Sequence, residues 1–164
     1  MTCDKDGNIL IQLVQTIVER APDKQPASNT ATPDDQLAAR QAEAHMQINI
    51  ARKAANRTPL TRNAALDKSA KSHAKYVASV GDLNAGGDPD GSLKERIEKW
   101  IKNPLVMFEF SANWASSVTE MTNAIMDHQK HRDIVLSDSN LIGIGVVDNF
   151  WTFQIVKDAL KEDQ

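Results

Sequence analysis

The chain has 164 residues, of which 25% are charged and 41% hydrophobic, ordinary values for a globular domain. Its 19 Lys and Arg residues against 22 Asp and Glu residues give a formal net charge of −3. This balance argues against a nucleic-acid-binding protein, because such proteins carry an excess of basic residues. No apolar stretch approaches the roughly 20 residues that a membrane-spanning helix needs. The single cysteine, Cys3, excludes an intrachain disulfide and a cysteine-based zinc module.

The N-terminal part of the chain is expected to lie outside the folded domain. Residues 9–18 are apolar and largely β-branched, and both a short helix and a strand fit them. Residues 21–31 contain two prolines and no large apolar side chain, which is typical of a linker. We therefore expect an N-terminal extension over residues 1–22, a linker over residues 23–36, a domain over residues 37–156 and a polar tail over residues 157–164.

Capping residues followed by apolar side chains at helical spacing predict four helices. They are expected to run from Thr32-Pro33 to about Ala55, from Asn63 to Gly81, from Ser92 to Trp100 and from Ser117 through His128. The first helix has mostly small side chains on its inner stripe, which indicates close packing against another element.

Alternating apolar residues predict the strands. Leu105 to Phe110 is one, and residues 141–147 and 150–156 are two more, joined by Asp148-Asn149. A two-residue connection of this kind is typical of a β-hairpin. The element order predicts an α+β fold in which helices cover a small antiparallel sheet.

Four short groups of residues can then be compared with a known family. They are Ile48–Arg52 with Pro59-Leu60, Gly81–Ala85, His131–Leu136, and Ile142–Val146 with Trp151–Gln154. Their order and spacing resemble those of the CAP superfamily (the SCP/PR-1-like domain) over about residues 37–156. The resemblance implies an α-β-α sandwich, which agrees with the element order.

The resemblance also implies a cleft. Many members hold a divalent metal such as zinc between two histidines and two acidic residues, and these four positions fall on Ala85, Glu109, His128 and His131. The first histidine is therefore lost and His128 stands at the second acidic position, so Glu109, His128 and His131 remain as candidate metal ligands. Three ligands and a water suit a catalytic zinc. In the alternative interpretation, neither histidine is a metal ligand. Both lie at the C-terminal end of a helix, where the helix dipole favours them, and Glu109 is a buried carboxyl group.

The segment from Trp100 to Phe110 is dense in large apolar side chains. Most of these are expected in the core. Because the resemblance associates apolar loops with lipid binding, Trp100, Val106, Phe108 and Phe110 are also candidate contacts for a sterol or fatty acid.

The remaining polar candidates favour structural roles. His45 and His73 lie within predicted helices and match no cleft position of the family. Residues 88–91 carry oxygen ligands but lack most positions of a calcium loop, so a plain turn is expected. No nucleophile motif is present.

These observations lead to one main hypothesis and two alternatives. The main hypothesis is a non-enzymatic, secreted CAP-domain protein that binds a small apolar ligand such as a sterol or fatty acid. The first alternative is a metal-dependent hydrolase with Glu109 as general base and His128 and His131 as ligands. The second is a module that binds a protein partner. No signal peptide is recognisable, so the chain is either cytosolic or has lost its signal.

Overall fold

A computed structural model describes residues 32–84, 86–113 and 117–159. The predicted N-terminal extension lies outside the described residues, as do most of the linker and the last five residues. The helices are α2 (Pro33–Ala54), α3 (Ala64–Val80), α4 (Leu93–Glu98), α5 (Val118–Asp127) and α6 (Gln129–Val135). The strands are β1 (Thr61–Arg62), β2 (Pro104–Asn113), β3 (Leu141–Val147) and β4 (Phe150–Asp158).

The predicted helix starts are confirmed by their caps. The side chains of Thr32 and Ser92 each form a capping box with the residue three positions on. The side-chain oxygen of Asn63 accepts hydrogen bonds from the first backbone N–H groups of α3, and Ser117 caps α5. Gly81 ends α3 in the left-handed conformation, which glycine adopts without a steric penalty.

The four strands form one mixed sheet in the order β1-β3-β4-β2. The predicted hairpin is confirmed, because β3 and β4 pair antiparallel around a turn at Asp148-Asn149. β2 pairs antiparallel with the other side of β4, which makes β4 a central strand. The prediction of a wholly antiparallel sheet is wrong at one edge, where β1 pairs parallel with β3. β1 has only two residues, too few to give a period-two signal in the sequence.

Two helix boundaries differ from the predicted ones. The chain does not continue as one helix through His128, because α5 ends at Asp127 and His128 takes an extended backbone (φ −81°, ψ 111°) before α6 begins. α4 ends at Glu98, two residues before Trp100.

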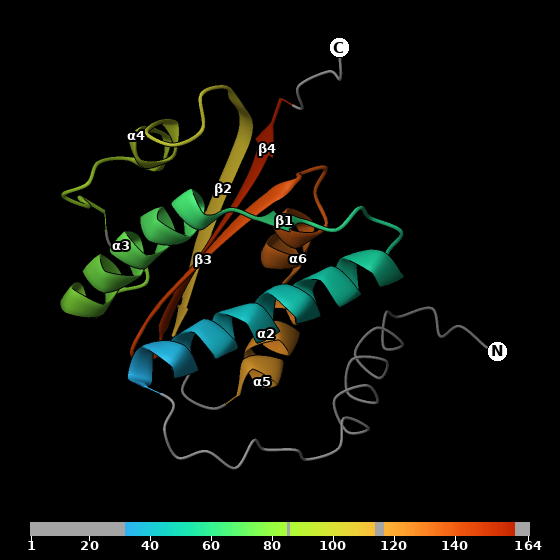
Figure 1. The fold of residues 1–164 in the computed structure, drawn as a ribbon, viewed down its shortest axis with the longest axis horizontal. Helices are drawn as coiled ribbons and strands as arrows, with labels where there is room; N and C mark the ends of the chain where they lie inside the picture. Colours follow the sequence, from blue (N-terminus) through green and yellow to red (C-terminus); the bar gives the residue numbers. More distant parts are fainter. Residues whose placement is uncertain (1–31, 85, 114–116, 160–164) are drawn as a thin grey trace.

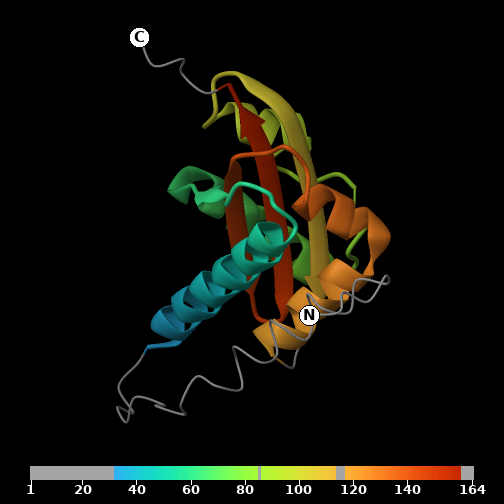
Figure 2. The same ribbon diagram turned by 90° about the vertical axis from the view of Figure 1, so that its right-hand side faces the viewer.

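Helices cover both faces of the sheet (Figures 1 and 2). The larger core lies on the face of α2, α5 and α6, where Ile48, Met121 and Val135 pack against Ile144 and Phe153 of the sheet. On the other face, Leu66 of α3 and Ile97 of α4 pack with Val156. The result is the α-β-α arrangement that the sequence predicted.

Two glycines of β3 let α3 lie directly on the sheet. A Cβ atom at Gly143 would come closer than 3.0 Å to the backbone of Leu66, and one at Gly145 would do the same at Ala70 and Lys71. The alternation in Ile142-Gly143-Ile144-Gly145 therefore separates two faces. The isoleucines fill the larger core on one face, and the glycines leave room for the backbone of α3 on the other.

A single buried arginine ties distant loops to α2. The guanidinium of Arg52 donates to the backbone oxygens of Thr58 (2.8 Å), Val135 (2.5 Å), Ser137 (3.0 Å) and Ser139 (3.1 Å). Arg52 is only 1% exposed, and its burial, with the charge of Arg57 nearby, lowers its pKa.

Asn49, one helical turn before Arg52, extends the same anchorage. Its side chain pairs with both the backbone N–H and the backbone oxygen of Leu60. The Asn-x-x-Arg spacing in α2 thus positions the segment that leads into β1.

Within the described ranges, none of the helices combines the length and the apolar character needed to cross a membrane.

Candidate functional site

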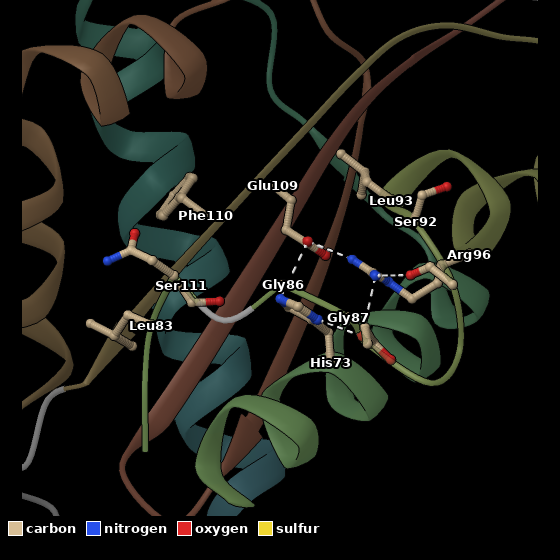
Figure 3. Close-up of a pocket in the computed structure, with 13 residues that line it drawn as sticks. His73, Leu83, Gly86, Gly87, Ser92, Leu93, Arg96, Glu109, Phe110 and Ser111 are labelled. Carbon is tan, nitrogen blue, oxygen red and sulfur yellow. Dashed lines mark hydrogen bonds and ion pairs between the residues drawn. The ribbon is translucent and has the colours of Figure 1, made fainter. Parts of the chain in front are cut away.

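A large pocket lies beside α3, α4 and β2 and is bordered by the loop between α3 and α4 (Figure 3). Its volume is about 470 Å³. Four ionisable side chains from three elements and the loop converge on it. They are His73 of α3, Asp88 of the loop, Arg96 of α4 and Glu109 of β2, and we call them the charge quartet.

Arg96 and His73 each contact both carboxylates of the charge quartet. Arg96 Nη2 lies 2.5 Å from Glu109 Oε1, and Arg96 Nη1 lies 3.2 Å from Asp88 Oδ2. His73 Nδ1 lies 2.6 Å from Asp88 Oδ2, and His73 Nε2 lies 3.4 Å from Glu109 Oε1. The four side chains are nearly buried, with exposed fractions between 5% and 13%. Protonation of His73 would make the quartet neutral, whereas neutral His73 leaves one net negative charge.

Further hydrogen bonds fix both carboxylates. Gln154 of β4 donates to the second oxygen of Glu109 at 2.8 Å, and Asp88 Oδ1 accepts from the backbone N–H of Asp90 at 2.8 Å. Burial by itself would raise the pKa of Asp88, but the bonds from His73 and Asp90 and the charge of Arg96 outweigh it and lower this pKa. Asp88 therefore stays ionised in the pocket.

Local structure brings Arg96 to this position. The capping box of Ser92 starts α4, and Gly91 before it has a positive φ of 98°. Arg96 Nη1 reaches back to the Gly91 oxygen at 2.6 Å. The predicted turn over residues 88–91 is confirmed by the bond from the Gly91 N–H to the Asp88 oxygen.

Sequence reasoning found one member of the charge quartet and missed three. His73 was expected to have a purely structural role, and Asp88 was expected to be only part of a turn. Arg96 had no expected role, although its place beside the apolar Ile97 on a short helix could have indicated burial. His45 does have a structural contact, to the backbone oxygen of Leu60 at 2.8 Å.

The three candidate metal ligands do not form one site in the structure. Glu109 points to α3 and α4, and it is held by Arg96 of α4 and Gln154 of β4. The neighbouring Phe110 points to the opposite face of the sheet and stacks on His131. Alternation along β2 therefore separates Glu109 from His128 and His131. Ala85, the fourth family position, lies outside the described residues.

A second observation on the described ranges bears on the metal hypothesis. No group of three or more His, Cys, Asp or Glu side chains placed to hold a metal ion occurs there. Glu109 is also in contact with a guanidinium, a positive charge that competes with any cation for its oxygens. These residues do not fit a zinc centre.

His128 and His131 nevertheless lie side by side at the junction of α5 and α6. Their ring centroids are 4.3 Å apart, and the ring of His131 stacks on Phe110 at 4.6 Å. Burial lowers the pKa of His131, and the nearby His128 lowers it further. The pair is a packed cluster at the edge of the larger core.

We expect His128→Asn to raise the pKa of His131 towards its ordinary value of 6.5, because one of the two causes of its depression is removed. Proton chemical shifts of the imidazole, followed from pH 4 to pH 8 by NMR, measure this change. The distant His45→Asn is the control and should leave the titration of His131 where it was. An unchanged His131 pKa in His128→Asn would show that the two rings are not coupled.

The four candidate lipid contacts do not line one cavity. Trp100 and Val106 are exposed at 49% and 39%, Phe108 is half-buried against the larger core, and Phe110 is 7% exposed. Only Phe110 borders the large pocket, and its ring points to the opposite face of the sheet. Besides Phe110, the large apolar residues that border the pocket are Leu83 and Leu93.

Comparisons with known proteins place this geometry in a family. Solved structures with the same fold include an extracellular protein containing an SCP domain from Bacillus anthracis str. Ames, with a TM-score of 0.69 and 20% identity. A cysteine-rich secretory protein from Staphylococcus aureus subsp. aureus Mu50 has a TM-score of 0.61 and 17% identity. An outer surface protein from Borrelia burgdorferi has a TM-score of 0.62 and 20% identity.

The extent of these matches differs. The match with the Bacillus protein covers 80% of this chain and 45% of that one. The match with the Staphylococcus protein covers 74% of this chain and 39% of that one, and the match with the Borrelia protein covers 74% and 94%. The chain thus spans less than half the length of the first two proteins. No curated protein sequence matches it. The model of the cysteine-rich secretory protein family, CAP, matches residues 45–154, and the chain therefore belongs to the CAP family.

Proposed function

We propose that this chain is a secreted, non-enzymatic binding protein whose pocket beside α3, α4 and β2 takes a small ligand. The observation that carries the proposal is the charge quartet. Both carboxylates of the pocket are already held by Arg96 and His73, so neither is free to act as a general base or as a metal ligand. What remains is an open, preformed pocket whose two carboxylates are already paired.

The ligand that we propose has an apolar part. Leu83 and Leu93 supply apolar contacts on the border of the pocket, and Leu83 is 39% exposed. A fatty acid or a sterol could cover these side chains and gain the free energy of burying apolar surface. Secretion is supported by the three structural relatives, which are described as extracellular, secretory and outer-surface proteins.

Native mass spectrometry of the protein with a mixture of fatty acids and sterols, plus zinc, tests the proposal. We expect a lipid adduct of one molecule per chain and no zinc adduct. The Leu83→Glu variant should bind the lipid at least about tenfold more weakly, because it places a charged carboxylate on the apolar border of the pocket. The matched control is Val80→Glu, since Val80 is 48% exposed on the same helix end but does not border the pocket.

Two results would contradict the proposal. A zinc adduct that disappears in His131→Ala would favour the metal-dependent hydrolase. The absence of both adducts would favour a domain that binds a protein partner.

A further inference from the structure

A second pocket lies between α3 and α4, and nothing described above uses it. Its volume is about 260 Å³. α3 contributes Lys68, Ser69 and Ser72, and α4 with the residues after it contributes Arg96, Lys99 and Trp100. We call it the α3–α4 groove. It is distinct from the large pocket, although Arg96 borders both.

Two buried polar atoms bordering the α3–α4 groove lack a partner. Within the described part of the chain, neither Ser69 Oγ nor Arg96 Nε makes a hydrogen bond. Ser69 is 6% exposed and Arg96 is 4% exposed. An unpaired buried donor is costly, and a guanidinium N–H can only donate. The partner that Arg96 Nε lacks must therefore be an acceptor such as an oxygen.

The charges at the groove favour an anionic acceptor. Lys68 and Lys99 are exposed side chains on opposite sides, one on α3 and one directly after α4. The one carboxylate that borders the groove, Asp90, already accepts a hydrogen bond from Ser72, and its backbone oxygen accepts from Lys99. The Nη groups of Arg96 are occupied by Asp88 and Glu109, which leaves its Nε for the groove.

From these contacts we infer that the α3–α4 groove binds a small oxyanion, a phosphate or a carboxylate group, through Lys68, Lys99, Ser69 and Arg96 Nε. Trp100, half-exposed on the border, offers a flat apolar face to the organic part of the ligand. Because the two unpartnered atoms are buried, a bound anion reaches them only when side chains that border the groove move.

Titration of the isotope-labelled protein with inorganic phosphate, and separately with acetate, tests the inference by NMR. We expect saturable shifts at the Arg96 Nε–H, the Ser69 amide and the Trp100 indole N–H. Shifts with phosphate alone would identify a phosphate ligand, and shifts with both anions would identify a general oxyanion site. The double variant Lys68→Gln/Lys99→Gln should weaken binding at least about tenfold.

The control is Lys75→Gln/Lys94→Gln, which removes the same charge from exposed positions of α3 and α4 that do not border the groove. It should bind phosphate as the unmodified chain does. Shifts that do not saturate, or that fall equally in both double variants, would overturn the inference. Neither result bears on the lipid adduct of the large pocket, because neither double variant alters a residue of that pocket.

Discussion

Arg52→Ala is expected to cost about 3–5 kcal/mol of the free energy of unfolding. The substitution leaves the backbone oxygens of Val135 and Ser139 buried without a donor, and it opens a cavity beneath α2. A domain of this size has only about 5–15 kcal/mol of stability in total. The variant should therefore be partly unfolded or close to it. Denaturant titration followed by circular dichroism measures the loss.

Two further variants make the result specific to the guanidinium. Arg52→Lys keeps the charge, but its three donors sit at one point and cannot reach four separate oxygens, so it should recover only part of the stability. Arg57→Ala removes an exposed arginine five residues on and should change the stability by no more than about 0.5 kcal/mol. Equal losses in Arg52→Ala and Arg57→Ala would refute the anchoring role.

Gly145→Ala is expected to destabilise the fold strongly, with a loss of about 3 kcal/mol in the free energy of unfolding. The new methyl group would lie closer than 3.0 Å to the backbone of Ala70 and Lys71. A side chain could relieve such a clash by changing its rotamer, but a helix backbone cannot. To accept it, α3 must move away from β3, which loosens the contacts of Leu66 and of His73 at once.

Gly86→Ala is the matched control for this overpacking. A Cβ atom at Gly86 meets nothing within 4 Å, so its stability should stay close to that of the unmodified chain. Thermal unfolding of the two variants side by side measures the difference. A loss below about 1 kcal/mol in Gly145→Ala would mean that α3 can shift at little cost.

Much of the fold could be predicted because its signals are local. Thr32, Asn63 and Ser92 each cap a helix through atoms within three residues, and the Asp148-Asn149 turn connects two adjacent strands. The break at His128 was not predicted, since His128 continues the face of α5 and carries no proline or glycine signal. β1 was missed because its pairing with β3 joins residues 80 positions apart.

The charge quartet could be predicted only in part. Asp88 and Arg96 lie eight residues apart, but His73 and Glu109 come from elements that only the tertiary fold brings together. One local signal was available, and it argued against a metal site that Glu109 shares with His128 and His131. Glu109 alternates with Phe108 and Phe110, so its side chain must face the opposite side of the sheet from theirs. Family positions alone do not carry that information.

The position of β4 has a consequence for biosynthesis. Among the described residues, β4 is the last strand in chain order and also a central strand of the sheet, where it pairs with β3 on one side and β2 on the other. While the chain is being synthesised, β2 therefore lacks the strand with which it pairs in the described sheet until residues 150–158 have left the ribosome. The described sheet can close only after this segment has been made.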